Sequence, residues 1–506
     1  MITVSDVWKN IQQRFLLPET YIELDCVISE VGAQESATAS GTDEAVFSSV
    51  ESTLTDETKT VKYATNELNL WALDGTRAIL PDAEPFSVSG YVSNTASSGS
   101  VTLTFPDVHT AASSGLTITW SSTFDEYPTV FSVVAKNGDT VVAETTITDN
   151  ISVISNVFVE LVNYDSITIT VHAWNIPEHR ARIEKIVIGH VLTLTKKDFL
   201  SFKHEQVGDL LSGELPKYSI EFSLDNTDGR WDPNNPTGME QYLSERQLIT
   251  LRYGLDIDGT VEWIKGGEFY LSEWNTPSNG LEARFVARDV LEFIVNQDVS
   301  GSAVYGNLTH LITWATATSF PKDASISIDP SLDYSPGRSP EINGTSAEIV
   351  QKSANAGCCI LRYDRNGVLN VERFRNILTD YTIPLSLSYT YPELTLSKPL
   401  KEVAVNYGEG TYKLTVSDSG ETQTVSNDYI LNEEYAENVA NWVQAVLQPR
   451  KTIHGEFRAD PRLDLYDVVR VEDKYGRWLT VVITNITYTF NGSLRGSYTG
   501  RILEEG

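Results

Sequence analysis

The sequence has few cysteines, few methionines and few basic residues. Its 506 residues include three cysteines and two methionines, and 38 Lys and Arg stand against 69 Asp and Glu, so the formal net charge is −31. This balance excludes a nucleic-acid binder that works by neutralising phosphates, and it argues against adsorption to an anionic membrane. Cys26 and the adjacent Cys358 and Cys359 form no CxxC motif, so we expect three buried free thiols in a chain made in a reducing compartment.

Long apolar runs and a leader pattern are also missing. No stretch approaches the ~18 uninterrupted apolar residues of a transmembrane helix, so we expect no membrane anchor. The first residues carry neither the basic nor the apolar region of a signal peptide. At roughly 100–200 residues per domain, the length predicts three domains or more.

The usual catalytic motifs do not occur. The sequence contains no HExxH, no GxSxG and no Walker loop, and His204-Glu205 lacks the second histidine of a zinc protease. His172 and His179 flank Trp174, but no cysteine or acidic cluster completes a zinc set around them. Among the many acids, no pair is singled out for glycoside hydrolysis. We therefore expect no catalytic residues, no metal and no cofactor.

One acidic loop, at 225–232, has two interpretations. It reads Asp-Asn-Thr-Asp-Gly-Arg-Trp-Asp, which loosely resembles an oxygen-rich calcium loop with a glycine at the turn. It lacks a terminal bidentate glutamate at the required spacing. We favour the alternative, in which Asp and Asn side chains accept hydrogen bonds from their own backbone.

Strand patterns dominate what is present. Apolar and polar residues alternate at 116–120 and 167–171, and Asn137-Gly138 between two alternating runs predicts a hairpin. Several short strands within 86–193 predict a β-sandwich. The stretch 31–60 is crowded with Ser, Thr, Asp and Glu, which predicts an exposed loop or a weak strand pair.

Three helices are indicated by spacing and caps. The first covers 4–15, the second follows the capping-box pair Thr345 and Glu348, and the third covers 431–448, capped by Asn432 and ended by Pro449. The apolar faces expected for the first and third helices are Val7, Trp8, Ile11 and Phe15, and Tyr435, Val439, Trp442, Val443 and Val446.

Aromatic residues in the predicted sandwich are candidates for stacking on sugar rings. Tyr164 lies there too, and each of these aromatics, taken singly, is more simply explained as a core or strand residue. The candidate glycan-binding residues are Trp120, Phe124, Tyr127 and Trp174.

Several stretches, taken in order along the chain, resemble the tail hub, or baseplate-hub-like, proteins of tailed phages. Residues 167–189 in addition resemble the last strands of a galactose-binding-like jelly roll. The stretches that carry the hub resemblance are 61–76, 215–226, 228–233, 242–243, 253–254, 267–274, 287–289, 347–351, 364–369, 460–469 and 490–496.

The resemblance implies a mainly β, multidomain fold with two hub-type β-barrels, an inserted jelly-roll-like β-sandwich and a small α/β insertion domain. A weak similarity between the strand-rich regions 195–300 and 396–506 agrees with two related barrels. The implied parts are an N-terminal helix and extended segment at 1–85, the sandwich at 86–193, the first barrel at 194–300, the α/β domain at 301–395, and the second barrel at 396–506 with a helix inserted at 431–448.

The resemblance also implies a structural role. Hub proteins are homotrimers that close the distal end of the tail tube, and two barrels per chain let a trimer meet a sixfold ring. The implied partners are the tube or distal tail protein ring, tail fibre, tape measure or tip proteins, and host surface glycans. DNA would pass through the lumen, and the protein would be made in the host cytoplasm and reside at the tail tip.

Three alternatives remain open at this point. A distal tail protein usually carries a single tube-like barrel, so the second barrel argues against it. A secreted glycan-binding or glycan-degrading protein would need an export signal and, for hydrolysis, a carboxylate pair. A peptidoglycan-cleaving tail enzyme would usually carry a further catalytic domain after the second barrel.

Overall fold

The chain is described here from a computed structural model, and its described residues form two compact units. Unit 1 comprises Met1–Leu24, Leu194–Asp232 and Ile249–Gly506, and unit 2 comprises Asp25–Thr193 and Pro233–Leu248. Within these units the described residues are 2–14, 19–29, 31–45, 48–55, 67, 90–110, 113–232, 234–235, 238–239, 243–257, 259–300, 306–317, 319–321, 324–332, 344–408, 410–430 and 432–505. The predicted mainly β, multidomain fold is confirmed, while the finer five-part division stays a prediction.

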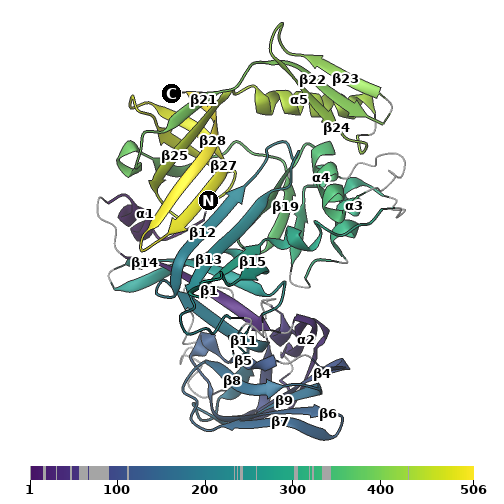
Figure 1. The fold of residues 1–506 in the computed structure, drawn as a ribbon. Helices are drawn as coiled ribbons and strands as arrows, with labels where there is room; N and C mark the ends of the chain where they lie inside the picture. Colours follow the sequence, from purple (N-terminus) through teal and green to yellow (C-terminus); the bar gives the residue numbers. More distant parts are fainter. Residues whose placement is uncertain are drawn as a thin grey trace. The chain divides into compact units, whose positions relative to one another are not determined.

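Unit 1 is built on one long antiparallel sheet with the strand order β21-β25-β28-β27-β12-β13-β16-β15-β14. Figure 1 shows β12 and β13 beside the yellow strands β27 and β28, which come from the far end of the sequence. The strands of this path are β12 (Phe199–Val207), β13 (Lys217–Asp225), β14 (Leu248–Ile257), β15 (Thr260–Asn275), β16 (Glu282–Arg288), β21 (Glu393–Leu396), β25 (Lys451–Arg458), β27 (Trp478–Phe490) and β28 (Leu494–Glu505).

The two strand-rich regions predicted as separate barrels share this sheet. β12 pairs with β27 in antiparallel register, from Phe202 opposite Phe490 to Val207 opposite Asn485. Among the described strands no ladder closes on itself, so neither region forms a closed barrel. The edge of β12 that could otherwise close the first region is used to pair with β27. A short parallel strand, β20 (Leu378–Ile383), is attached to β26 (Val468–Glu472), which pairs with β27.

A second group of elements in unit 1 is mixed α/β. Helices α3 (Leu308–Ala317) and α4 (Ser346–Ala356) accompany a three-stranded sheet of order β17-β19-β18. Their core also includes apolar residues of β22 and α5, which lie in the predicted second-barrel region. The remaining elements of this group are β17 (Ser325–Ile328), η5 (Pro330–Leu332), β18 (Ile360–Tyr363), β19 (Val368–Glu372), β22 (Leu400–Tyr407), β23 (Gly410–Thr415), β24 (Glu421–Ser426) and α5 (Glu433–Leu447).

The helix signals in the sequence are largely confirmed. Thr345 and Glu348 form the reciprocal capping box at the start of α4. Asn432 caps α5 by accepting a hydrogen bond from the backbone N–H of Tyr435. The buried face of α5 consists of Ala436, Val439, Ala440 and Val443, whereas Tyr435 and Trp442 are partly buried against the same core.

The first helix is shorter than predicted. α1 covers Asp6–Gln12 and is capped by Ser5, whose hydroxyl accepts from the backbone N–H of Trp8. Trp8 and Ile11 are buried, but Val7, which was expected on the same face, is exposed. The last residue expected on its apolar face, Phe15, lies outside the described residues.

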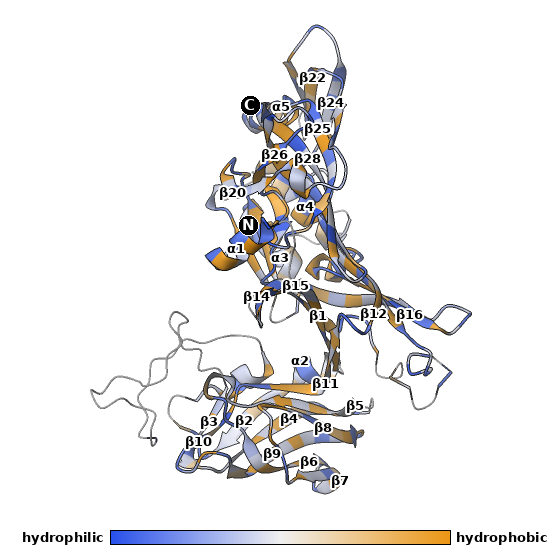
Figure 2. Ribbon diagram, turned by 90° about the vertical axis from the view of Figure 1, so that its left-hand side faces the viewer, coloured by the Kyte–Doolittle hydropathy of each residue, from blue (hydrophilic) through white to orange (hydrophobic). Residues whose placement is uncertain are grey.

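Unit 2 contains the predicted sandwich. One sheet has the order β2-β4-β9-β6-β7, and β11-β5-β8 forms the facing ladder. Figure 2 shows hydrophobic and hydrophilic residues alternating along these strands, as two packed sheets require. The elements, of which β1 begins in unit 1 and β11 ends in it, are β1 (Thr20–Ser29), α2 (Val31–Ser36), β2 (Thr38–Thr42), η1 (Val50–Leu54), β3 (Tyr91–Ala96), β4 (Gly99–His109), β5 (Ser113–Thr119), η2 (Ser122–Phe124), β6 (Pro128–Asn137), β7 (Thr140–Ile147), β8 (Ile154–Leu161), β9 (Tyr164–Trp174), β10 (Arg180–Ile183) and β11 (Lys185–Thr195).

Two local predictions in unit 2 need correction. The described part of 31–60 is not a simple exposed loop, because β2 pairs with β4, and Ala33, Val50 and Leu54 are buried in the sandwich core. The hairpin between β6 and β7 turns one residue later than predicted. Asn137 pairs with Thr140, so the two turn residues are Gly138, with φ of +57°, and Asp139.

Two short 3₁₀ turns complete the elements of unit 1. The 3₁₀ turns η4 (Val290–Phe293) and η6 (Leu385–Leu387) lie in unit 1. Within the described part of the chain, no helix has the length and apolar character needed to span a membrane.

Candidate functional site

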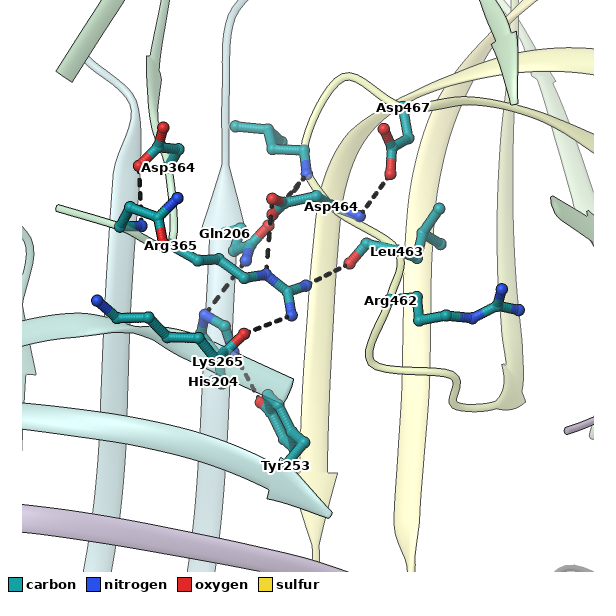
Figure 3. A network of polar contacts seen from close by, with 12 residues as sticks. His204, Gln206, Tyr253, Lys265, Asp364, Arg365, Arg462, Leu463, Asp464 and Asp467 are labelled. Atoms are coloured by element: carbon teal, nitrogen blue, oxygen red, sulfur yellow. Dashed lines mark hydrogen bonds and ion pairs between the residues drawn. The ribbon is translucent and has the colours of Figure 1, made fainter. Parts of the chain in front are cut away.

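Arg365 is the centre of a buried polar network in unit 1 (Figure 3). It lies in the turn between β18 and β19, and its side chain is almost fully buried. Its guanidinium donates to the backbone carbonyls of Lys265, at 3.1 Å, and Leu463, at 2.9 Å. Its Nε lies 3.6 Å from the carboxylate of Asp464. A hairpin of the α/β group is thereby joined to β15 and to the loop that precedes β26.

The loop before β26 is held from its other side by β12. The backbone N–H of Leu465 donates to Oε1 of Gln206 at 3.1 Å, and the N–H of Asp464 donates to Asp467 at 2.9 Å. The amide nitrogen of Gln206 lies 3.3 Å from Nε2 of His204. Because Oε1 of Gln206 accepts from the backbone, its amide NH₂ is the donor to the imidazole.

His204 ends the network inside the sheet. It is fully buried, and its Nδ1 lies 2.8 Å from the hydroxyl of Tyr253 on β14. Since Nε2 accepts from Gln206, Nδ1 carries the proton and donates to the Tyr253 oxygen. Burial, together with the nearby charge of Arg365, lowers the pKa of His204 to about 3. The imidazole is therefore neutral near pH 7 and acts as a fixed link between β12 and β14.

A neighbouring set of contacts involves Asp460. Its carboxylate accepts from Arg462, whose Nε lies 2.8 Å away, and from the backbone N–H of the same residue at 3.1 Å. The hydroxyl of Tyr488 donates to the backbone carbonyls of Asp460, at 3.2 Å, and Leu463, at 2.7 Å. The stretch 460–469, which carries part of the sequence resemblance, is thus the stretch held by both sets of contacts.

The network is suited to positioning rather than to chemistry. Its side chains form hydrogen bonds with one another or with the backbone. The charge of Arg365 is paired with Asp464, and His204 is held neutral. Such an arrangement fixes the relative positions of β12, β14, β15, the β18–β19 hairpin and the 460–467 loop. Sequence reasoning selected the stretches 364–369 and 460–469 and named His204, but it did not predict the contacts among them, because the partners lie far apart along the chain.

The two predicted sugar-stacking tryptophans lie in the core of unit 2. Trp120 is fully buried, and its indole N–H donates to the Ser155 hydroxyl at 2.8 Å. Trp174 is nearly buried, and its indole N–H donates to Glu126 at 2.9 Å. The two rings contact each other edge to face, with centroids 6.2 Å apart. In this structure their faces are used for packing, which is the alternative raised for each residue taken singly.

The other two predicted residues are partly exposed. Tyr127 packs against the sandwich core with part of its surface in solvent. The ring of Phe124 is also partly buried, and the guanidinium of Arg182 lies 5.0 Å from its centroid. The structure does not bring the four predicted residues together on one open surface. Glycan binding through Phe124 and Tyr127 stays a prediction.

Glu126 contacts three polar groups near these aromatic residues, on His179, Trp174 and Arg182. Its Oε1 lies 2.5 Å from Nδ1 of His179, its Oε2 accepts from Trp174, and Arg182 lies 3.6 Å from it. His172 is elsewhere, with Nε2 2.8 Å from the hydroxyl of Ser132 on β6. The two histidines weighed as zinc ligands therefore have different protein partners.

The described residues contain no group of three or more His, Cys, Asp or Glu side chains arranged to hold a metal ion. The acidic loop at 225–232 forms the predicted Asx turns. Asp225 accepts from the backbone N–H of Thr227, Asp228 from that of Arg230, and Asn226 from that of Trp231. These side chains are used to shape the turn before β14.

All three cysteines are free thiols, but only Cys359 is fully buried. Cys26 and Cys358 are partly exposed, so the expectation of three buried thiols is wrong for two of them. Burial nevertheless raises the pKa of Cys358 to about 11 and of Cys359 to about 12, and it raises the pKa of Cys26 as well. The thiols are therefore protonated at neutral pH and are poor nucleophiles.

Comparison with protein-family models and with curated proteins gives no match. Among solved structures, the chain is similar to the 43 kDa tail protein of prophage MuSo2 from Shewanella oneidensis, with 13% identity, a TM-score of 0.45, and coverage of 62% of this chain and 95% of that one. It is similar to the tail protein from Neisseria meningitidis MC58, with 12% identity, a TM-score of 0.45, and coverage of 62% and 94%. It is also similar to prophage tail protein gp18 from Listeria monocytogenes, with 14% identity, a TM-score of 0.41, and coverage of 63% and 93%. Phage tail proteins are thus among its structural neighbours.

Proposed function

We propose that this chain is a non-enzymatic structural protein of a phage tail, a hub at the distal end of the tail tube. The observation that carries the proposal is the β12–β27 ladder. It joins the four antiparallel strands β21, β25, β28 and β27, which lie late in the sequence, to the strands β12, β13, β16, β15 and β14. One chain therefore presents two strand-rich regions, and three chains would present six, which suits a ring of sixfold symmetry.

The stretch 377–396 supports self-association as a homotrimer. It contains six exposed large apolar side chains and ends in β21, which is the edge strand of the sheet path described above. An edge strand with exposed apolar residues pairs readily with another chain. Burial of these side chains between copies of the chain would remove their apolar surface from water. The six residues are Ile377, Leu378, Tyr389, Tyr391, Leu394 and Leu396.

The remaining parts of the proposal follow from this assembly. The trimer would meet the tube or the distal tail protein ring on one side and fibre, tape measure or tip proteins on the other. A net charge of −31 would keep DNA phosphates from adhering to a lumen during passage. The sandwich would bind host surface glycans, and the protein would reside at the tail tip after synthesis in the host cytoplasm.

The test is the mass of the purified chain in solution together with negative-stain electron microscopy. The proposal expects threefold particles of three chains with about six similar lobes around a channel. Mixing with the distal tail protein of the same phage is the second arm, since an isolated hub chain can require its neighbour for assembly. A monomer that also fails to join that ring would overturn the proposal.

A further inference from the structure

Strand β8 presents an aromatic ring to solvent on the outer face of the sandwich. Ile154, Asn156, Phe158 and Glu160 are exposed, whereas Ser155, Val157 and Leu161 between and beyond them are buried. Phe158 is 76% exposed, which makes it the most exposed aromatic side chain in the described part of unit 2. Covering this ring would remove a large apolar area from water.

The ring of Phe158 is held in place from one side. It stacks on the imidazole of His190, with centroids 4.2 Å apart and an angle of 29° between the planes. His190 is itself 5% exposed, so it forms a fixed base beneath the ring. The solvent-exposed area therefore belongs to the opposite face and the rim of the Phe158 ring.

The adjacent strand keeps the space beside the ring open. Gly115 pairs with Phe158 across the ladder and has φ of +142°. A Cβ at this position would lie 1.9 Å from the carbonyl oxygen of Val157, so the backbone here admits only glycine. No side chain from this position can cover the aromatic face.

Hydrogen-bonding groups flank the ring along the same strand. Oδ1 of Asn156 accepts from the Thr117 hydroxyl at 2.7 Å, which orients the amide and leaves its NH₂ group as the donor on offer. Glu160 supplies an exposed carboxylate acceptor on the other side. Asn156 and Phe158 lie on the regular part of the ladder, where side chains two residues apart are separated by roughly 7 Å, and Glu160 follows at the register shift between Phe158 and Leu161. An aromatic face between a donor and an acceptor matches a pyranose, which combines an apolar C–H face with hydroxyls around its rim.

We propose that Phe158, with Asn156 and Glu160, forms a carbohydrate-binding site for an uncharged pyranose. The carboxylate of Glu160 and the acidity of the whole chain disfavour acidic sugars. This inference rests on the part of the proposed function in which the sandwich binds glycans, and it moves the binding surface away from Trp120 and Trp174, which are buried.

The test is saturation-transfer difference NMR on the full chain with the methyl glycosides of glucose, galactose, mannose and N-acetylglucosamine, and with glucuronic acid. We expect at least one neutral glycoside to give a signal that Phe158→Ala reduces about tenfold or more. Asn156→Ala is expected to weaken the same signal. Ile151→Ala is the matched control, because Ile151 is an even more exposed apolar residue just before β8. Thermal unfolding confirms that each variant folds.

Each other outcome overturns the inference in a distinguishable way. If a neutral sugar binds and Phe158→Ala binds it equally well, the sandwich binds glycans at another surface. If no sugar gives a signal, the glycan part of the proposed function fails together with this site, while the assembly test remains independent. If Phe158→Ala changes only the mass of the protein in solution, the ring belongs to a protein interface. Preferred binding of glucuronic acid would contradict the choice of an uncharged ligand.

Discussion

Nδ1 of His204 lies 2.8 Å from the hydroxyl of Tyr253, and this contact joins β12 to β14 inside the sheet of unit 1. Two residues placed 49 positions apart in the sequence are thereby fixed in one arrangement. The adjoining contact with Gln206 depends on a neutral imidazole, because a second proton on the ring would remove the acceptor that the Gln206 amide uses.

His204 therefore makes unit 1 sensitive to acid. Its pKa is about 3 in the folded chain and ~6.5 when unfolded, so between these values the unfolded state binds more protons. The free energy of unfolding is expected to fall as the pH decreases from about 6.5 toward 3. His204→Gln should flatten this dependence, as measured by urea unfolding at several pH values. His310→Gln, at an exposed position, is the control, and identical pH profiles for His204→Gln and the wild type would contradict the prediction.

Asp289 has the opposite dependence. Burial raises its pKa to about 7, although the backbone N–H groups of Tyr218 and Leu291 donate to its carboxylate at 2.9 and 2.8 Å. Because the folded state holds this proton more tightly, the contribution is present below pH ~4 and is lost as the pH rises through 7. Asp289→Asn should remove up to about 4 kcal/mol of this pH dependence, as measured by urea unfolding between pH 4 and 8. An unchanged slope would show that Asp289 is ionised in the folded chain.

Arg365 and Asp464 form a buried pair whose separation should be costly. Replacement by Arg365→Leu leaves the Asp464 carboxylate buried without its cation and is expected to cost about 3–5 kcal/mol. Arg284→Leu removes an exposed pair with Glu282 and should cost less than about 1 kcal/mol. Chemical denaturation of both variants checks this difference. Similar losses for the two variants would mean that the network does not hold unit 1 together.

Trp120 should matter to the stability of unit 2. Trp120→Ala empties a fully buried site beside Phe131 and Trp174 and leaves the Ser155 hydroxyl without its donor. A loss of about 3–5 kcal/mol is expected in the unfolding transition of this unit. Phe124→Ala, at a partly exposed position, should cost clearly less. Near-ultraviolet circular dichroism during denaturation follows both, and a mild Trp120→Ala variant would contradict the core assignment.

Leu396 tests the proposed interface between copies. It is 60% exposed on the edge strand β21, and Leu396→Lys would place a charge where apolar contact is required. The self-association constant should weaken at least tenfold by analytical ultracentrifugation. Leu281→Lys, at an equally exposed leucine in a turn of unit 1, should leave association unchanged. If both substitutions weakened self-association equally, the added charge and not the position of Leu396 would explain the effect, and the proposed interface would be contradicted.

Sequence patterns located the parts of this fold that depend on neighbours along the chain. The Thr345–Glu348 capping box, the Asn432 cap and the Asx turns at 225–232 all involve residues within five positions of one another. The same reasoning failed where distant segments decide the outcome. Trp120 and Trp174 could not be assigned to the core before the two sheets were known to face each other.

The candidate sites show the same limit. Alternation along β8 is visible in the sequence, but the stack of Phe158 on His190 brings together two strands that are not adjacent in the chain. The pairing of Arg365 with Asp464 likewise joins residues about a hundred positions apart. Burial and partner identity therefore had to come from the structure.

The pairing of β12 with β27 determines when, during synthesis of the chain, the sheet of unit 1 can be completed. β12 emerges from the ribosome long before its partner β27, because most of the strands and helices of unit 1 lie between them in the sequence. All strands of the sandwich in unit 2 precede residue 196, so that unit has its core complete while one edge of β12 still waits for β27. The sheet of unit 1 can consequently be completed only after β27 has been made, and a chain released before that point would expose an unpaired strand edge to its neighbours.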